Sequence, residues 1–263
     1  MPCNIKSGFD TEEADAVVVQ PHLLSKSDYL DVKIPWPHKK PHQLFVSLSY
    51  EHPVKYPIQL EKEIHRHVDL YMNFSLKSDV PISLVCPFGG GDITQFKAPF
   101  VSEQKGEIVG IFSKCEKEAN ERFRYLSELM QHLNIDFYGE CLNNKGVKKK
   151  YYTLNSQINC KYKKKGKNFT LNSSSTHAEL IEKKKEVYSK YKFVLAFETA
   201  EYEDFVSSKL VTALQAAAVP IYWGTSRVDP LWVPGPRSII IANDFKGSFL
   251  TQFFHRIIQS FIE

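Results

Sequence analysis

Short apolar segments alternate with amphipathic segments over the second half of the chain, and this pattern limits the fold more than any other feature. Glu107–Ser113 is a brief run with β-branched residues, typical of a buried strand. Residues 116–133 follow with apolar residues at helical spacing, among them Phe123 and Leu126. The alternation predicts further strands and helices, with strands at 135–139, 192–197, 219–223 and 237–242 and helices near 177–190, 205–218 and 247–262. Such alternation predicts an α/β fold with a parallel, doubly wound sheet.

The first half of the chain shows the same pattern in weaker form. It predicts four strands and one helix, with strands at 15–19, 43–49, 68–71 and 81–85 and a helix near 58–66. Periodicity is lost near residues 95–106. We therefore predict an N-terminal Rossmann-like domain over 1–105 and a C-terminal one over 106–263. Two such α/β lobes are expected to hold a ligand in a cleft between them, at the carboxyl ends of their strands.

Composition excludes several classes of protein. Hydrophobic residues make up 43% of the 263 residues and aromatic residues 13%, which supplies a core and excludes a largely disordered chain. The net charge of +4 is too small for a bulk nucleic-acid binder. No apolar run approaches the roughly 18 residues that span a bilayer, and the N-terminus lacks the apolar region of a signal peptide. We expect a soluble, globular chain.

Positive charge is concentrated in residues 145–192, which hold 14 lysines against 3 glutamates. One interpretation is an arm that binds a polyanion, either nucleic acid or an anionic membrane surface. The other is a solvated, lysine-rich insertion near 145–176 in a surface loop. The insertion is favoured, because no aromatic or arginine pattern of a recognition motif accompanies the lysines.

The sequence offers no recognisable metal site. The five cysteines show neither the CxxC pattern nor a Cys/His pairing at zinc spacing. The chain also lacks Asp-x-Asp, the carboxylate pair that commonly holds a divalent metal on a nucleotide-sugar diphosphate. Gly89–Gly91 is not followed by the Gly-Lys of a phosphate loop and is interpreted as a turn. Metal-dependent chemistry is therefore disfavoured, and no cofactor is expected.

Residues 191–224 carry the strongest chemical signal. A strand ends at Phe197, an acidic loop follows, and a helix begins near Phe205 with Lys209 in its first turns. A helix N-terminus attracts anions through its free N–H groups and its dipole, and a lysine there adds a full charge. The segment thus predicts a phosphate site. The alternative is a core strand followed by an ordinary helix whose lysine faces water.

This segment resembles the signature of the α1,3-fucosyltransferases, approximately YKFxLAFEN…DYVTEK…AxxAxAVPVxxG. In this chain it is YKFVLAFETAEYEDFVSSKLVTALQAAAVPIYWG. Four earlier segments are similar to family motifs in the family's order, namely Glu12–Val19, Ser49–Pro57, Met72–Pro81 and Asn134–Cys141. The matches span residues 12–245, with the lysine-rich insertion as the main interruption. The Ser78–Pro81 motif is more similar to enzymes that fucosylate the N-glycan core than to the Lewis type.

The resemblance implies a GT-B architecture, in which the C-terminal of two Rossmann-like domains holds GDP-fucose. Fucose would pass in α1,3 linkage to GlcNAc of a glycoprotein glycan, by one in-line displacement that inverts the anomeric centre and needs no metal. The family's proposed base matches Glu51, which follows a predicted strand, where a general base is expected. The family also implies Golgi residence, through a membrane anchor that is not visible in this chain.

The resemblance also assigns residues that bind the donor. The family's arginine matches Arg122, with Arg124 as the alternative if the alignment shifts, and its diphosphate lysine matches Lys209. Two such cations would offset charge that develops on departing GDP. Three further positions match donor-binding residues of the family, namely Glu198, Phe205 and Ser208.

Three positions depart from the family pattern. The chain has Phe205 in place of Tyr, Ser208 in place of Glu and Thr199 in place of Asn. The lost glutamate and amide contact the donor in the family, so three classes of function stay open. The first is an active fucosyltransferase, and the second is a pseudoenzyme of the same fold that binds nucleotide or glycan. The third is a polyanion-binding protein that acts through the lysine-rich insertion.

Overall fold

The computed structural model divides the chain into two compact units. Unit 1 comprises Met1–Leu84 and Tyr202–Phe205, and unit 2 comprises Val85–Glu201 and Val206–Glu263. The structure describes residues 11–23, 36–82, 106–112, 121–139, 141–146, 174–226, 228, 232–235 and 237–244. The predicted boundary at 105/106, the predicted helix 247–262, Gly89–Gly91 and most of the lysine-rich insertion lie outside the described residues. Each of these stays a prediction.

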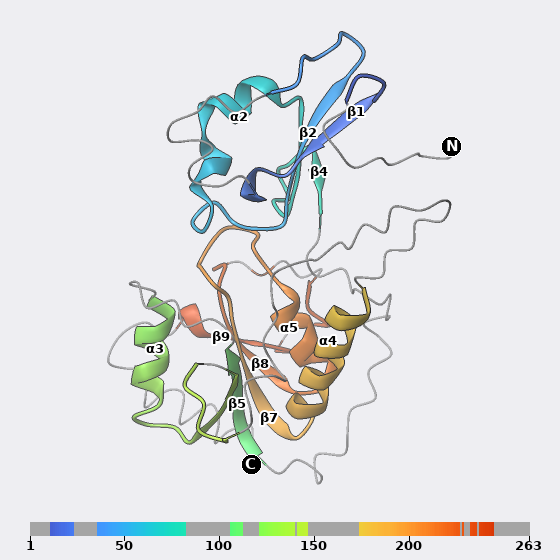
Figure 1. Ribbon diagram of the computed structural model, residues 1–263. Coiled ribbons are helices and arrows are strands. Elements are labelled where there is room, and N and C mark those ends of the chain that lie inside the picture. Colours follow the sequence, from blue (N-terminus) through green and yellow to red (C-terminus); the bar gives the residue numbers. More distant parts are fainter. Residues whose placement is uncertain are drawn as a thin grey trace. The chain divides into compact units, whose positions relative to one another are not determined.

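Unit 1 is built on four parallel strands in the order β1-β2-β3-β4 (Figure 1). The strands are β1 (Ala16–Val19), β2 (Leu44–Ser49), β3 (Leu70–Asn73) and β4 (Val80–Pro81). The described connections between these strands contain two 3-10 helices and one α-helix, namely η1 (Pro21–Leu23), η2 (Pro57–Leu60) and α2 (Lys62–His67). The predicted helix 58–66 is therefore split, because the backbone of Glu61 is extended, with φ −67° and ψ 133°. The side chains of Phe45, Ile58, Ile64 and Phe74 form the buried apolar interior.

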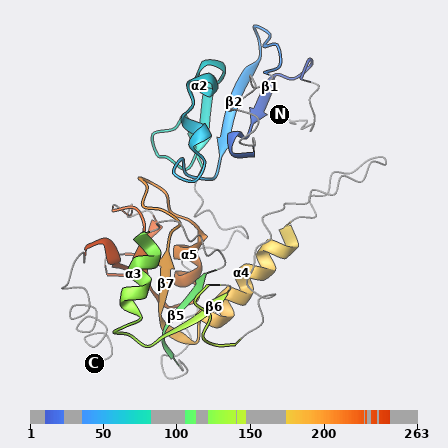
Figure 2. The ribbon, with the colours of Figure 1, turned by 60° about the vertical axis from the view of Figure 1, so that its left-hand side comes forward.

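Unit 2 is built on five parallel strands in the order β6-β5-β7-β8-β9. The strands are β5 (Gly106–Phe112), β6 (Ile135–Gly139), β7 (Tyr191–Phe197), β8 (Val219–Trp223) and β9 (Ile240–Ile241). Among the described residues of this unit, four helices follow or connect the strands, namely α3 (Glu121–Leu129), α4 (Ser174–Tyr188), α5 (Ser208–Gln215) and η7 (Ala242–Asp244). In Figures 1 and 2, α3 covers one face of the sheet, and α4 and α5 cover the other. The predicted doubly wound α/β sheet is confirmed here.

The strand order of unit 2 reverses between β5 and β7. The chain adds β6 on one side of β5 and then places β7, β8 and β9 on the other. In open α/β sheets a ligand binds beside such a reversal, outside the carboxyl ends of the strands. A ligand site in unit 2 is therefore expected at the end of β7.

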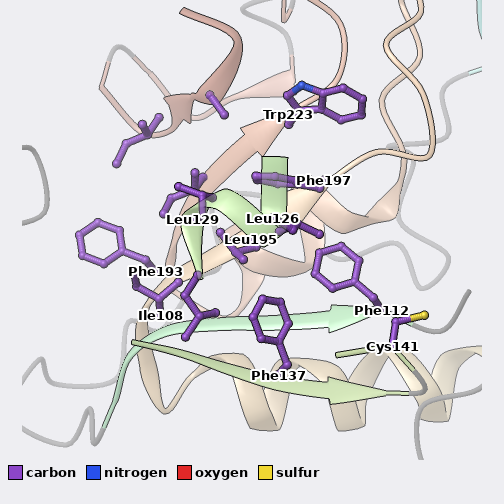
Figure 3. Packing of buried hydrophobic residues seen from close by; sticks show 14 residues of the cluster. Ile108, Phe112, Leu126, Leu129, Phe137, Cys141, Phe193, Leu195, Phe197 and Trp223 are labelled. Carbon is purple, nitrogen blue, oxygen red and sulfur yellow. The ribbon is translucent and has the colours of Figure 1, made fainter. Parts of the chain in front are cut away.

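Side chains of β7 alternate between the two faces of the sheet, and both faces are buried. Phe193, Leu195 and Phe197 join the cluster under α3, where Figure 3 shows Leu195 and Phe197 near Leu126. Val194 and Ala196 join the clusters on the face of α4 and α5. A strand covered on both faces needs a continuous apolar run, which explains the sequence Phe-Val-Leu-Ala-Phe.

The last strand is shorter than predicted. Residues 237–242 were expected as a strand, yet β9 contains only Ile240–Ile241. Arg237 has φ +65°, which is incompatible with a strand, and the backbone N–H and the hydroxyl of Ser238 donate to the carbonyl of Gly235. A turn therefore occupies the start of the expected strand. In the described part of the chain, no helix is long and apolar enough to cross a membrane.

Candidate functional site

Glu198 lies at the strand reversal of unit 2, immediately after β7. Its backbone N–H donates to the carbonyl of Trp223 at the end of β8, over 2.8 Å. This hydrogen bond continues the pairing of β7 with β8 by one residue and fixes the start of the loop that follows. The side chain of Glu198 is fully buried, with 0% exposure. Burying a carboxylate costs free energy unless the charge is paired, so the hydrogen-bond partners of Glu198 are important for the stability of the fold here.

The carboxylate of Glu198 is paired through both oxygens. Oε1 accepts from the backbone N–H of Ser207 at 2.7 Å. Oε2 accepts from the Ser207 hydroxyl at 2.8 Å and from Lys209 Nζ at 2.7 Å. Charge-assisted hydrogen bonds of this kind are stronger than neutral ones, and the ion pair offsets the cost of burial. Glu198 therefore ties the start of α5 to the end of β7.

The first turn of α5 carries a cation at the positive end of the helix. Ser207 is the N-cap, and its side chain accepts from the backbone N–H of Lys209. Lys209 Nζ donates to the Ser207 hydroxyl at 2.9 Å and keeps 31% of its side chain exposed. Ser208 is the first helical residue and is half-buried. The helix dipole and the partly exposed ammonium group both favour negative charge at this end of α5, and the Glu198 carboxylate lies there.

Arg122 joins the same point of the fold from α3. Its side chain is buried, with 2% exposure, and Nη1 donates to the carbonyl of Glu198 at 3.3 Å. Its guanidinium carbon lies 5.5 Å and 5.1 Å from the ring centroids of Phe112 and Phe123, within cation–π range. Arg124 is exposed. The structure therefore places Arg122, and not Arg124, beside Glu198.

Gly224 keeps space open behind Glu198. A Cβ atom on Gly224 would lie 2.4 Å from the Tyr222 hydroxyl oxygen and 2.9 Å from Glu198 Cγ. Burial raises the pKa of Tyr222, and the charge of Glu198 raises it further, so this phenol stays neutral beside the carboxylate. The glycine that ends the 191–224 segment is thus explained by the close approach of two buried side chains.

Phe205 is placed in unit 1. Its ring is buried, with a centroid 4.7 Å from that of His52 and 5.0 Å from that of Phe74. Asp204 beside it has φ +61°, and its Oδ2 accepts from the backbone N–H of Leu76 at 2.9 Å. A donor-binding role of Phe205 stays a prediction. The structure shows that its ring packs in unit 1, and this packing does not need the hydroxyl of the tyrosine that the family pattern has at this position.

Glu51 also lies in unit 1, two residues after the end of β2, as predicted from the sequence. Its Oε1 accepts from Lys55 Nζ at 2.8 Å, and its side chain is 32% exposed. The carboxylate is thus at the carboxyl end of a parallel strand and reachable by solvent, as a general base must be.

Comparison with known proteins assigns the family. Residues 101–260 match the family model described as Glycosyltransferase family 10 (fucosyltransferase) C-term. The chain belongs to glycosyltransferase family 10. The predicted resemblance to fucosyltransferases is confirmed. The family-10 match includes Arg122, Glu198, Ser208 and Lys209, whereas Glu51 precedes it.

Individual relatives within family 10 are distant and longer. The chain is 28% identical over 214 residues to alpha-(1,3)-fucosyltransferase B of Drosophila melanogaster, covering 78% of this chain and 43% of that protein. It is 35% identical over 133 residues to GDP-fucose protein O-fucosyltransferase 3 of Xenopus laevis, covering 51% of this chain and 23% of that protein. A crystal structure of an alpha1,3-fucosyltransferase with GDP aligns with 16% identity and a TM-score of 0.48, covering 94% of this chain and 65% of that one. The chain therefore spans less than half the length of these two curated relatives.

Two contacts of the site were missed by sequence reasoning. Ser207, and not Ser208, binds Glu198, because the N-cap position turns its hydroxyl back toward the end of β7. Lys55 pairs with Glu51 across a turn that periodicity does not reveal. The signal for Ser207 was present, since serine just before a helical segment is a common N-cap. Among the described residues, no group of three or more His, Cys, Asp or Glu side chains could hold a metal ion.

One further lysine lies near the family-10 site. Lys184 is half-buried in α4, which packs against α5. Burial, together with the charge of Lys209, lowers the pKa of Lys184 to about 8. Lys184 therefore adds a third cationic side chain close enough to Lys209 for the two charges to interact.

Lys184→Met is expected to stabilise the protein at pH 7 by on the order of 1–3 kcal/mol. The unfolded chain binds this proton with the ordinary pKa of 10.5, the folded chain with a pKa of about 8. Wild-type stability therefore rises with pH between 8 and 10.5, and is lowered by a constant amount below pH 8. Urea unfolding at pH 7 and pH 10 measures both effects, with the exposed neighbour Lys183→Met as the control. Equal pH slopes in Lys184→Met and the wild type would contradict this.

Proposed function

We propose that this chain transfers L-fucose from GDP-fucose in α1,3 linkage to GlcNAc of a glycoprotein glycan, with inversion at the anomeric carbon. The observation that carries the proposal is the Arg122–Glu198–Lys209 cluster at the strand reversal of unit 2. This cluster joins two cations to a helix N-terminus, which suits the diphosphate of a nucleotide sugar. It lies in a family-10 domain, and a relative is named alpha-(1,3)-fucosyltransferase B.

In the proposed reaction the acceptor oxygen attacks C1 of fucose while the bond from C1 to the GDP oxygen breaks. The proton of the acceptor hydroxyl passes to the Glu51 carboxylate, which acts as general base. Negative charge grows on the departing diphosphate, and Lys209 with Arg122 offsets it. Glu198 holds Lys209 and the first turn of α5 in place before the donor binds. No metal is assigned to any of these roles.

The acceptor has a second candidate. Several relatives at 29–35% identity, among them proteins of Xenopus laevis and Danio rerio, are named GDP-fucose protein O-fucosyltransferase 3. Their names favour a hydroxyl group of a protein as the alternative acceptor. The same donor site and the same base would serve either hydroxyl.

The proposed location is the Golgi, in the secretory pathway. Cys141 is disulfide-bonded, and the other four cysteines all lie outside the described residues. Disulfides persist in oxidising compartments and are rare in the cytosol. The disulfide at Cys141 therefore supports a secretory compartment for this chain.

Acceptor-dependent release of GDP tests the proposal. The purified chain is incubated with GDP-fucose and, separately, a core N-glycan, N-acetyllactosamine, or a folded secreted domain that exposes serine and threonine. We expect GDP release and a fucosylated product with the core N-glycan, and the product's anomeric configuration by NMR tests inversion. Product with the protein domain alone would favour O-fucosylation. GDP binding without release for any acceptor would favour the pseudoenzyme.

A further inference from the structure

The Glu51–Lys55 pair is held by the turn that follows β2. Lys55 Nζ donates to Glu51 Oε1 at 2.8 Å, and the lysine side chain is only 18% exposed. The ammonium also lies 4.9 Å from the ring centroid of Tyr56, within cation–π range. A lysine that is free in solvent would not be confined in this way. The ion pair is therefore an ordered part of the turn after β2.

The backbone at both ends of this pair is fixed. The Ser49 hydroxyl accepts from the N–H of Glu51 at 3.3 Å, and Gln59 Nε2 donates to the carbonyl of Glu51 at 3.0 Å. The carbonyl of His52 accepts from the N–H groups of Lys55 and Tyr56 at 3.1 Å and 3.2 Å. Since both backbones are anchored, the ion pair sets the rotamer of the Glu51 side chain.

The two carboxylate oxygens of Glu51 differ in their hydrogen bonds. Oε1 is bound by Lys55, whereas no hydrogen bond from the described residues reaches Oε2. A general base needs an oxygen within hydrogen-bond reach of the hydroxyl that it deprotonates. Oε2 meets this need, and the contact at Oε1 keeps it from rotating away.

The electrostatic surroundings of the pair are simple. Burial lowers the pKa of Lys55, but its hydrogen bond to Glu51, the Glu51 charge and Tyr56 outweigh this, so the pKa lies above the ordinary 10.5. Besides Tyr56, the turn contains the titratable group His52, which packs against the segment Tyr202–Phe205. The carboxylates of that segment are engaged elsewhere, Glu203 with Lys77 and Asp204 with Leu76 and Ser75. Within the described part of the chain, Lys55 is thus the cation that forms an ion pair with Glu51.

We propose that Lys55 is a positioning residue for the transfer reaction, holding the Glu51 side chain so that Oε2 is aimed at the acceptor hydroxyl. This rests on the proposed function, in which Glu51 is the base. A base that loses its orientation reacts more slowly with bound substrate, so kcat is expected to change more than KM.

Lys55→Met is expected to lower kcat about tenfold while the acceptor KM stays within about twofold, because the base is no longer held in place. Lys55→Arg keeps the charge and a hydrogen-bond donor to Glu51, so it is expected to restore most of the wild-type kcat. Lys55→Gln is measured in parallel in case the methionine variant does not fold, and thermal melting checks each variant. Lys62→Met, an exposed lysine at the start of α2, is the matched control.

A kcat within about twofold of the wild type in both neutral variants, or a loss in Lys55→Arg equal to that in Lys55→Met, would overturn the role of Lys55. Glu51→Gln separates this failure from failure of the proposed function. If Glu51→Gln is inactive while both neutral Lys55 variants keep the wild-type kcat, only the positioning role is wrong. If Glu51→Gln keeps full turnover, the base assignment itself is wrong, whatever Lys55 does.

Discussion

Glu51→Gln is expected to lower turnover by about 10²–10⁴-fold while GDP binding stays unchanged, because an amide cannot accept the proton of the acceptor hydroxyl. The change is isosteric, and the amide oxygen can still accept from Lys55, so the turn after β2 keeps its shape. GDP release under saturating donor measures turnover, and calorimetric titration measures GDP affinity.

Glu61→Gln is the matched control for this change. Glu61 is exposed, lies in the same unit and makes no side-chain cap to α2, so its loss is expected to leave turnover unaltered. Turnover in Glu51→Gln within a few-fold of the wild type would show that another group takes the proton.

Glu198→Ala is expected to destabilise unit 2 by about 3 kcal/mol and to weaken GDP binding at least tenfold. Removing one partner of a buried ion pair typically costs about 3–5 kcal/mol, and the partial exposure of Lys209 brings the value to the lower end. Ser207 loses two hydrogen bonds, so the N-terminus of α5 loses its attachment to β7. Urea unfolding and GDP titration measure the two effects.

Two further variants are compared with Glu198→Ala, a conservative change at the same position and a control at an exposed glutamate. Glu198→Gln keeps the shape and an acceptor for Ser207, so it should cost less than the alanine change. Glu186→Gln removes an exposed glutamate of α4 whose pair with Lys190 spans 3.7 Å, and it should change stability by under about 1 kcal/mol. Equal stability of Glu198→Ala and the wild type would mean that the buried carboxylate does not anchor α5.

The sheet of unit 2 could be predicted from the sequence because its strands are buried on both faces. The apolar runs of β7 and β8 begin and end within one residue of the predicted ranges. The short elements could not be predicted as well. The helix after residue 58 is interrupted at Glu61, and β9 is cut short by the turn at Arg237, since local backbone conformation decides both.

The candidate site could be predicted only where the family motif supplied the residues. The motif gave Arg122, Glu198 and Lys209, and the fold brings them together from α3, the end of β7 and the start of α5. It could not show that Glu198 is a buried anchor, because burial depends on how β7 and β8 pair. Nor could it place Phe205 in unit 1, which requires the tertiary contacts with His52 and Phe74.

The most direct test of a donor site at the strand reversal is GDP titration of Glu198→Gln beside the double variant Glu198→Gln/Lys209→Met. Both variants lack the buried carboxylate charge, so removing the Lys209 ammonium leaves no buried carboxylate without its ion-pair partner. A charge-assisted contact to phosphate contributes about 1.5–3 kcal/mol, so the double variant is expected to bind GDP roughly 10–100-fold more weakly than Glu198→Gln. Equal GDP affinity of the two variants would contradict a diphosphate site at Lys209.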